Sequence, residues 1–149
     1  MTNVFDVASF ILEKCGRITT WKLQKLVYYC QAWSLVWDDE PLFSEKIEAW
    51  ANGPVVRELY NLHKGRFYIS RLSCGNPGDL NQSQKDTICA VIDYYGKKSS
   101  QWLSDLAHME DPWKEARKGI SEKMRGYREI TLESMAKYYS SIVPEEDSQ

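Results

Sequence analysis

The sequence predicts a mainly α fold: a compact single-domain bundle of about six to seven helices with a short two-stranded β-ribbon near residues 46–50 and 66–72. Apolar residues recur at helical spacing through most of the chain, and capping residues stand where those helices would begin or end. With 149 residues, 43% hydrophobic and 27% charged, the chain has the composition of one globular domain. We expect residues 1–143 to form this domain and the acidic tail 144–149 to be flexible.

Two helices are predicted at the start of the chain. Apolar residues recur every three or four positions over Asn3–Lys14, and Gly16 follows where a helix-ending glycine is expected. Thr19 or Thr20 can cap a longer helix, TWKLQKLVYYCQAWSLVW. Its wide apolar stripe predicts a central core helix, with Lys22 and Lys25 on the other side.

The segment IEAW predicts a short strand, with alternate residues on opposite faces, and Asn52-Gly53-Pro54 predicts a corner after it. Pro54 suits the first position of a helix, where its missing N–H costs nothing, with Gly53 as N-cap. We therefore expect a helix over Val55–Lys64. RFYISRL, about residues 66–72, is the best other strand candidate, and we expect it to pair with IEAW and to pack on helices.

Four more helices are predicted in the second half of the chain, where capping residues precede apolar stripes. The expected helix starts are Asn81 or Ser83, Ser99 or Ser100, Asp111 with Pro112 at the first position, and Thr131.

Composition and cysteine spacing limit the function classes. A net charge of −2 does not indicate nucleic-acid or membrane binding, and there is no apolar run of about eighteen residues. The N-terminal segment is too polar for a secretory signal. The four cysteines are isolated, so with His63 and His108 they lack the close spacing of a zinc site. We expect a cytoplasmic protein with reduced thiols and without metal or cofactor.

The residues that could support catalysis are few. His108 and Asp111 are spaced so that the carboxylate could orient the imidazole as a base, but no nucleophile accompanies them and Asp111 is already the expected helix cap. We therefore expect no catalytic residue and keep a small enzyme using this pair only as an alternative. Six tryptophans and nine tyrosines are a high aromatic content, which favours binding over catalysis.

Two features could bind anions, and both have a simpler interpretation. The stretch Lys114–Arg128 holds six basic and two acidic residues, but no known nucleic-acid module surrounds it. A solvated loop is favoured, and we expect no nucleic-acid partner. The expected helix start at Gly53-Pro54 has neither a glycine-rich loop nor a nearby lysine, so it gives only a weak anion signal.

Three blocks of sequence resemble the Panacea antitoxin domain family, the SocA-like and phage-associated GepA-like proteins of bacteria and prophages. The blocks are KLQKLVYYCQAW (22–33), PLFSEKIEAWANGPVVRELY (41–60) and LAHMEDPWKEA (106–116), in the order and spacing of the family. The middle block is the most specific. The resemblance implies a mostly helical single domain and carries over no catalytic residues.

The resemblance also implies an antitoxin that binds and neutralises a toxin encoded by a neighbouring gene. An adaptor that delivers a bound protein to a housekeeping protease is the alternative. Aromatic and arginine side chains dominate binding interfaces, and we expect Arg57 to be exposed and Trp113 to be at least half buried. The candidate partner-binding residues are Trp50, Gly53, Pro54, Arg57, Tyr60 and Trp113.

Overall fold

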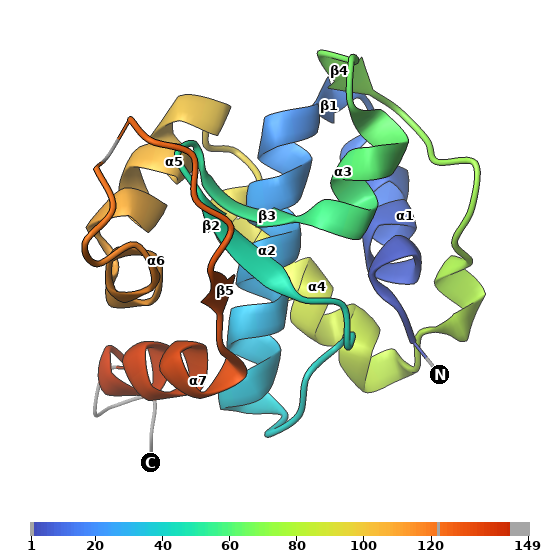
Figure 1. The fold of residues 1–149 in the computed structure, drawn as a ribbon. Coiled ribbons are helices and arrows are strands. Elements are labelled where there is room, and N and C mark those ends of the chain that lie inside the picture. Colours follow the sequence, from blue (N-terminus) through green and yellow to red (C-terminus); the bar gives the residue numbers. More distant parts are fainter. Residues whose placement is uncertain (1, 122, 144–149) are drawn as a thin grey trace.

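The computed structural model describes residues 2–121 and 123–143, and the expected tail, 144–149, lies outside them. The described residues form a mainly helical domain, as predicted, with one long helix through its middle (Figure 1). This central helix is α2 (Thr20–Trp37), and the helices packed around it are α1 (Val4–Cys15), α4 (Gln82–Tyr95), α5 (Ser100–Met109) and α7 (Leu132–Ser141). The shorter helices are α3 (Arg57–His63), α6 (Asp111–Ala116) and the 3-10 helix η1 (Pro77–Asp79).

Most helix boundaries follow the predicted capping residues. The hydroxyls of Thr19, Ser99 and Thr131 accept hydrogen bonds from backbone N–H groups in the first turns of α2, α5 and α7. Asn81 caps α4 in a reciprocal capping box, and Gly16 ends α1 with a φ of 71°. Helix α6 differs, because Glu110 stands at its N-cap position without a side-chain bond. Asp111 and Pro112 are therefore its first two residues, and the predicted Asp111 cap is wrong.

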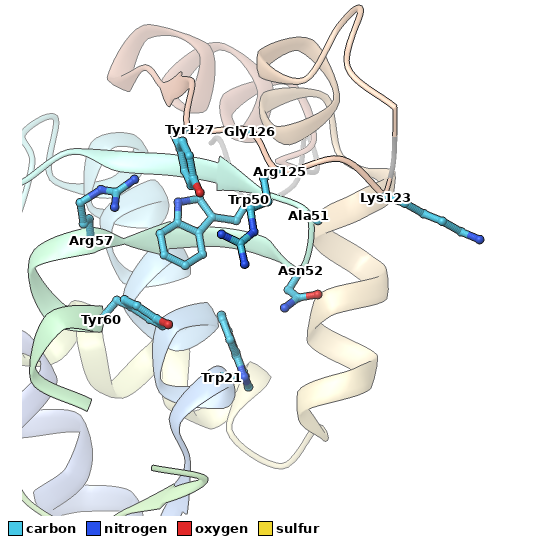
Figure 2. A pocket seen from close by; sticks show the side chains of 10 residues that line it. All are labelled: Trp21, Trp50, Ala51, Asn52, Arg57, Tyr60, Lys123, Arg125, Gly126 and Tyr127. Atoms are coloured by element: carbon cyan, nitrogen blue, oxygen red, sulfur yellow. The ribbon is translucent and has the colours of Figure 1, made fainter. Parts of the chain in front are cut away.

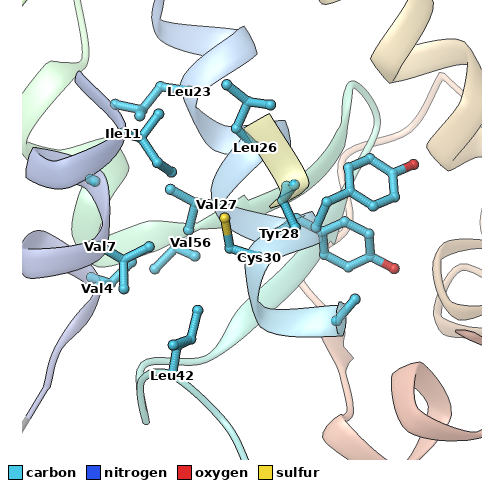
Figure 3. Close-up of a cluster of buried hydrophobic side chains, with 14 of the residues drawn as sticks. Val4, Val7, Ile11, Leu23, Leu26, Val27, Tyr28, Cys30, Leu42 and Val56 are labelled. Atoms are coloured by element: carbon cyan, nitrogen blue, oxygen red, sulfur yellow. The ribbon is translucent and has the colours of Figure 1, made fainter. Parts of the chain in front are cut away.

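The apolar core lies between α1, α2 and the segments packed on them (Figure 3). Val7 and Ile11 of α1 and Leu23 and Val27 of α2 are completely buried. Cys30 is buried in the same cluster, where burial raises the pKa of its thiol well above the usual value. The thiol therefore serves as a small apolar group, as expected for a buried free cysteine.

Helix α2 also buries polar side chains, because neighbouring elements surround it. Gln31 accepts hydrogen bonds from Leu42 N–H at 2.7 Å and Phe43 N–H at 3.3 Å, which holds the loop after α2 against the core. Lys25 was expected on the polar side of the helix, yet its exposed fraction is only 1%. The predicted position is wrong because a β-hairpin covers that side of α2.

The hairpin consists of β2 (Ile47–Trp50) and β3 (Gly53–Val56), which pair antiparallel from Ile47↔Val56 to Trp50↔Gly53. A two-residue loop joins the strands, and β5 (Glu129–Ile130) pairs with the other edge of β2. Residues 66–72 do not pair with IEAW; Tyr68–Ile69 forms β4 and pairs with β1 (Ile18–Thr19). The predicted ribbon partner is therefore wrong.

The hairpin forms because β3, which was predicted as a helix start, is equally well suited to a strand. Val55 and Val56 are β-branched, and closing a two-residue loop costs little entropy. Pro54 lies on an edge strand, opposite Ala49. The N–H of Ala49 instead donates to Arg128 O at 2.8 Å, and its carbonyl accepts from Arg117 Nη1 at 2.9 Å. The missing N–H of Pro54 thus removes no ladder bond, and the predicted helix over Val55–Lys64 begins only at Arg57.

Candidate partner-binding surface

The hairpin and α3 bring three of the predicted residues together. Glu48 and Trp50 lie on the less buried face of β2, and α3 begins beside them with Arg57. The rings of Trp50 and Tyr60 meet edge to face, with centroids 4.8 Å apart. The Arg57 guanidinium lies over the Trp50 ring at 5.4 Å. This group forms because the chain passes directly from β3 into α3.

Glu48 holds two members of this group in place. One of its oxygens, Oε1, accepts from Trp50 Nε1 at 2.8 Å and from Arg57 Nη2 at 2.9 Å. The Arg57 side chain nevertheless remains 44% exposed, against 18% for Glu48. The expected exposure of Arg57 is thus met in part: its guanidinium is oriented by Glu48 and remains accessible to another molecule.

A pocket of about 500 Å³ opens at this group (Figure 2). Tyr127 closes one side: its ring centroid lies 5.8 Å from that of Trp50 and 4.7 Å from the Arg57 guanidinium. Trp21, from the start of α2, lies on the side of Tyr60, with ring centroids 6.3 Å apart. The remaining lining residues are Ala51, Asn52, Lys123, Arg125 and Gly126. We call the whole set of lining residues the aromatic–cationic surface.

Sequence reasoning missed Trp21 and Tyr127. Trp21 lies outside the apolar stripe of α2, and Tyr127 is an aromatic residue within the basic stretch Lys114–Arg128. An aromatic side chain among basic residues is the signal that could have indicated a binding surface. The segment before β5 adds two exposed cations, Lys123 and Arg125, and Figure 2 shows the Lys123 side chain pointing away from the pocket.

The basic stretch is anchored as well as solvated. Arg117 is 4% exposed and donates to Ala49 O at 2.9 Å, Ser121 O at 2.9 Å and Met124 O at 2.5 Å. Its guanidinium therefore fixes the loop before β5 to the sheet. The expectation of a solvated loop is wrong for Lys114, which lies in α6, and Arg117 has a structural role. It holds for the exposed side chains of Lys118, Lys123, Arg125 and Arg128.

The other predicted residues lie beneath the surface. Gly53 and Pro54 are buried in β3, and Gly53 has a φ of 121°, a conformation that favours glycine. Trp113 is 7% exposed, which confirms its expected burial, and its Nε1 donates to Trp50 O at 2.8 Å. Gly53 and Pro54 thus shape the hairpin itself and Trp113 supports it, whereas Trp50, Arg57 and Tyr60 reach the pocket.

The two histidines make structural contacts. His108 Nε2 lies 3.0 Å from Ala51 O, and because a carbonyl only accepts, this nitrogen carries the proton and donates it. The His108 ring also packs on Trp113, with centroids 4.2 Å apart. His63 is buried, Gln24 Nε2 donates to its Nε2 at 2.9 Å, and burial lowers its pKa. Both side chains thus hold the hairpin and α3 in position.

The described residues offer neither a metal site nor a membrane-spanning helix. No group of His, Cys, Asp and Glu side chains in residues 2–121 and 123–143 could hold a metal ion. None of the helices in this part of the chain is long and apolar enough to cross a membrane.

The fold and surface define a class of protein: a small helical domain that presents an aromatic–cationic surface. A model of the family described as Antitoxin SocA-like, Panacea domain, matches residues 23–114, which is more than half of the chain. The chain belongs to this family. Membership supports a general antitoxin role, suggests a protein partner and points away from an enzyme. Neither a search of curated proteins nor a search of solved structures found a match.

The family match covers part of the candidate surface. Trp50, Arg57 and Tyr60 lie within residues 23–114, together with Trp113 beneath them. Trp21 and Tyr127 lie outside that range, although they line the same pocket. The surface therefore combines a part within the matched region with two aromatic side chains from outside it.

Proposed function

We propose that the protein is an antitoxin that binds and neutralises a toxin encoded by a neighbouring gene. The protein would be encoded by a bacterium or a prophage and would act in the bacterial cytoplasm. Family membership supports the role. The binding site is inferred from the pocket of about 500 Å³, where the Arg57 guanidinium contacts the rings of Trp50 and Tyr127 and Tyr60 packs on Trp50.

The side chains of this surface suit protein recognition. Tryptophan, tyrosine and arginine contribute most of the binding energy at typical interfaces, because they bury a large area and also make polar contacts. Glu48 already orients Trp50 and Arg57, so less side-chain entropy is lost when a partner binds. The arrangement thus fits a preorganised interface.

The charge of the surface indicates the chemistry of the partner. Lys123 and Arg125 are exposed. The Arg57 guanidinium pairs with Glu48 and contacts two aromatic rings, and among the described residues no acidic side chain lines the pocket. Complementary charge guides encounter and excludes wrong partners. We therefore infer that the toxin presents an acidic segment with an apolar or aromatic side chain that enters the pocket.

The proposal is tested by expressing the neighbouring reading frame alone and together with this protein. We expect growth arrest from the toxin alone, growth with the wild-type protein, and co-purification of the two chains. Trp50→Ala and Arg57→Glu should each weaken rescue and co-purification. Growth unaffected by every neighbouring gene product would contradict the antitoxin role.

Matched substitutions outside the surface serve as controls. Trp102 is 40% exposed on α5, and Arg71 is exposed in the segment before η1. Trp102→Ala and Arg71→Glu should retain rescue. If they impair it as much as Trp50→Ala and Arg57→Glu, the partner binds elsewhere. Circular dichroism of each variant separates loss of binding from loss of folding.

The half-life of the toxin distinguishes neutralisation by sequestration from delivery to a protease. Direct sequestration leaves the toxin as long-lived with this protein as without it. A toxin that is degraded faster in the presence of this protein would replace sequestration by the adaptor role, with a housekeeping protease as a further partner.

A further inference from the structure

Lys25 is a buried amine that forms no ion pair with the part of the chain that the structure describes. Its exposed fraction is 1%, and its Nζ donates to Pro54 O at 3.2 Å and lies 5.2 Å from the Trp21 ring centroid. Among the described residues, the one ion pair within 4.0 Å joins Arg57 and Glu48, so no carboxylate pairs with Lys25. An ammonium group has three donors, and a buried charge without a partner is costly.

This side chain forms part of the wall of a second pocket, of about 330 Å³. The pocket lies between α2, the hairpin loop and one face of α5. Its other lining residues are Trp21, Asn52, Ser100, Gln101, Ser104 and His108. The first N–H groups of a helix have no acceptor within the helix, and the helix dipole gives that end a partial positive charge. Lys25 is therefore the main group that favours an anion in this pocket, and the start of α5, at Ser100 and Gln101, adds to it at one end.

Among the described residues around Lys25, the two nearby histidines are held by other groups. His108 lines the pocket and donates to Ala51 O, and His63, behind β3, accepts from Gln24. Within residues 2–121 and 123–143, no acidic side chain lines the pocket. Burial lowers the pKa of Lys25 to about 7, so an anion would also stabilise the protonated amine.

We propose that this pocket is a carboxylate site, in which Lys25 pairs with an acidic side chain of the protein partner. That the carboxylate comes from a toxin rests on the proposed function, whereas the affinity of the pocket for a carboxylate does not. Trp21 and Asn52 line both this pocket and the aromatic–cationic surface. A partner that covers the surface can therefore insert an acidic side chain beside Lys25.

The site is tested without any partner by using acetate as the probe. The side-chain resonances of Lys25 are followed by NMR in protein with isotope-labelled lysine, with chloride at equal ionic strength as control. We expect acetate to shift the Lys25 signals saturably and to raise the pKa of the amine. Shifts no larger than those with chloride would overturn the proposal. Inorganic phosphate that binds tenfold more tightly than acetate would replace the carboxylate by a phosphate ligand.

Two variants make the test specific. Lys25→Met should remove the acetate response, which identifies the site, provided that circular dichroism shows a folded protein. Asn52→Asp changes an exposed loop residue and introduces a carboxylate into the pocket. It should raise the pKa of Lys25 and weaken acetate binding at least threefold. Acetate binding that is unchanged in Asn52→Asp would place the anion elsewhere and contradict the proposal.

When the toxin is available, calorimetry in buffers of different ionisation enthalpy measures the protons taken up on binding. With a pKa near 7, the free amine is about half protonated at pH 7, so pairing should take up about half a proton. Lys25→Met should abolish this uptake and weaken the complex at least tenfold. Neutralisation without proton uptake would overturn the Lys25 pairing but leave the antitoxin role intact.

Discussion

The side-chain amide of Gln24 pairs with the backbone of Val56 as a neighbouring strand would. Its Oε1 accepts from Val56 N–H at 2.9 Å, and its Nε2 donates to Val56 O at 3.2 Å. The same Nε2 donates to His63 at the end of α3. One side chain of the central helix thus closes the free edge of β3 at the residue where α3 begins, and so positions Arg57.

Replacing Gln24 should therefore destabilise the whole domain. Gln24→Leu leaves the buried N–H and C=O of Val56 without partners, and we expect a loss of about 2–4 kcal/mol of unfolding free energy. Urea unfolding measures it. Gln101→Leu is the control, because Gln101 is exposed and its amide donates only to Asp105 on the same helix. Equal effects of the two variants would contradict the role of Gln24.

A side chain at Gly53 should lower the unfolding free energy. A Cβ at this position would lie 2.7 Å from Cε of Lys25, in a backbone conformation with a φ of 121°. Gly53→Ala should cost about 3 kcal/mol or more, from strain and from displacement of Lys25. Gly65→Ala has a positive φ but nothing within 4 Å, so it should cost only about 1–2 kcal/mol. Thermal unfolding that ranks Gly65→Ala as the more damaging would contradict this account.

Lys25 should make the stability depend on pH. Its pKa is lowered from 10.5 in the unfolded chain to about 7 in the folded one, so between these values the unfolded chain binds more protons. Its destabilising contribution is therefore complete below about pH 7 and disappears as the pH rises towards 10.5, by about 1.4 kcal/mol per pH unit within this window. Urea unfolding at several pH values measures the slope.

The comparison with Lys25→Met isolates this contribution. The variant should be more stable than the wild type at pH 7, and its advantage should shrink by about 1.4 kcal/mol per unit between about pH 8 and 9.5. An advantage that stays constant with pH would show that the amine titrates near its usual pKa in the folded protein.

Glu48 should affect binding more than stability. Glu48→Ala releases Trp50 and Arg57 from their shared acceptor, so both side chains must be ordered when the partner binds. We expect the dissociation constant for the toxin to rise about fivefold to tenfold, while the unfolding free energy changes by less than about 1 kcal/mol. Glu58→Ala, an exposed acid on α3, should change neither. An unchanged affinity in Glu48→Ala would show that the surface needs no preorganisation.

The helices of this protein could be predicted because their signals are local. Thr19, Asn81, Ser99 and Thr131 each cap the helix that follows them, through a bond that spans only three residues. The β-structure was predicted less well. Pro54 and Gly53 suit a helix start as well as an edge strand, and only the pairing with β2 and the contact with Gln24 decide between them.

The sequence by itself determined a mainly helical domain of this family and a group of candidate residues, Trp50, Arg57 and Tyr60, which a short hairpin and the following helix bring together. The tertiary structure alone decided that Trp21 and Tyr127 complete the pocket. It also decided that Lys25 is buried and has no ion-pair partner among the described residues. The physical reason is the range of the interactions. Caps and apolar periodicity act within a few residues, whereas burial of a helix face depends on which distant segment covers it.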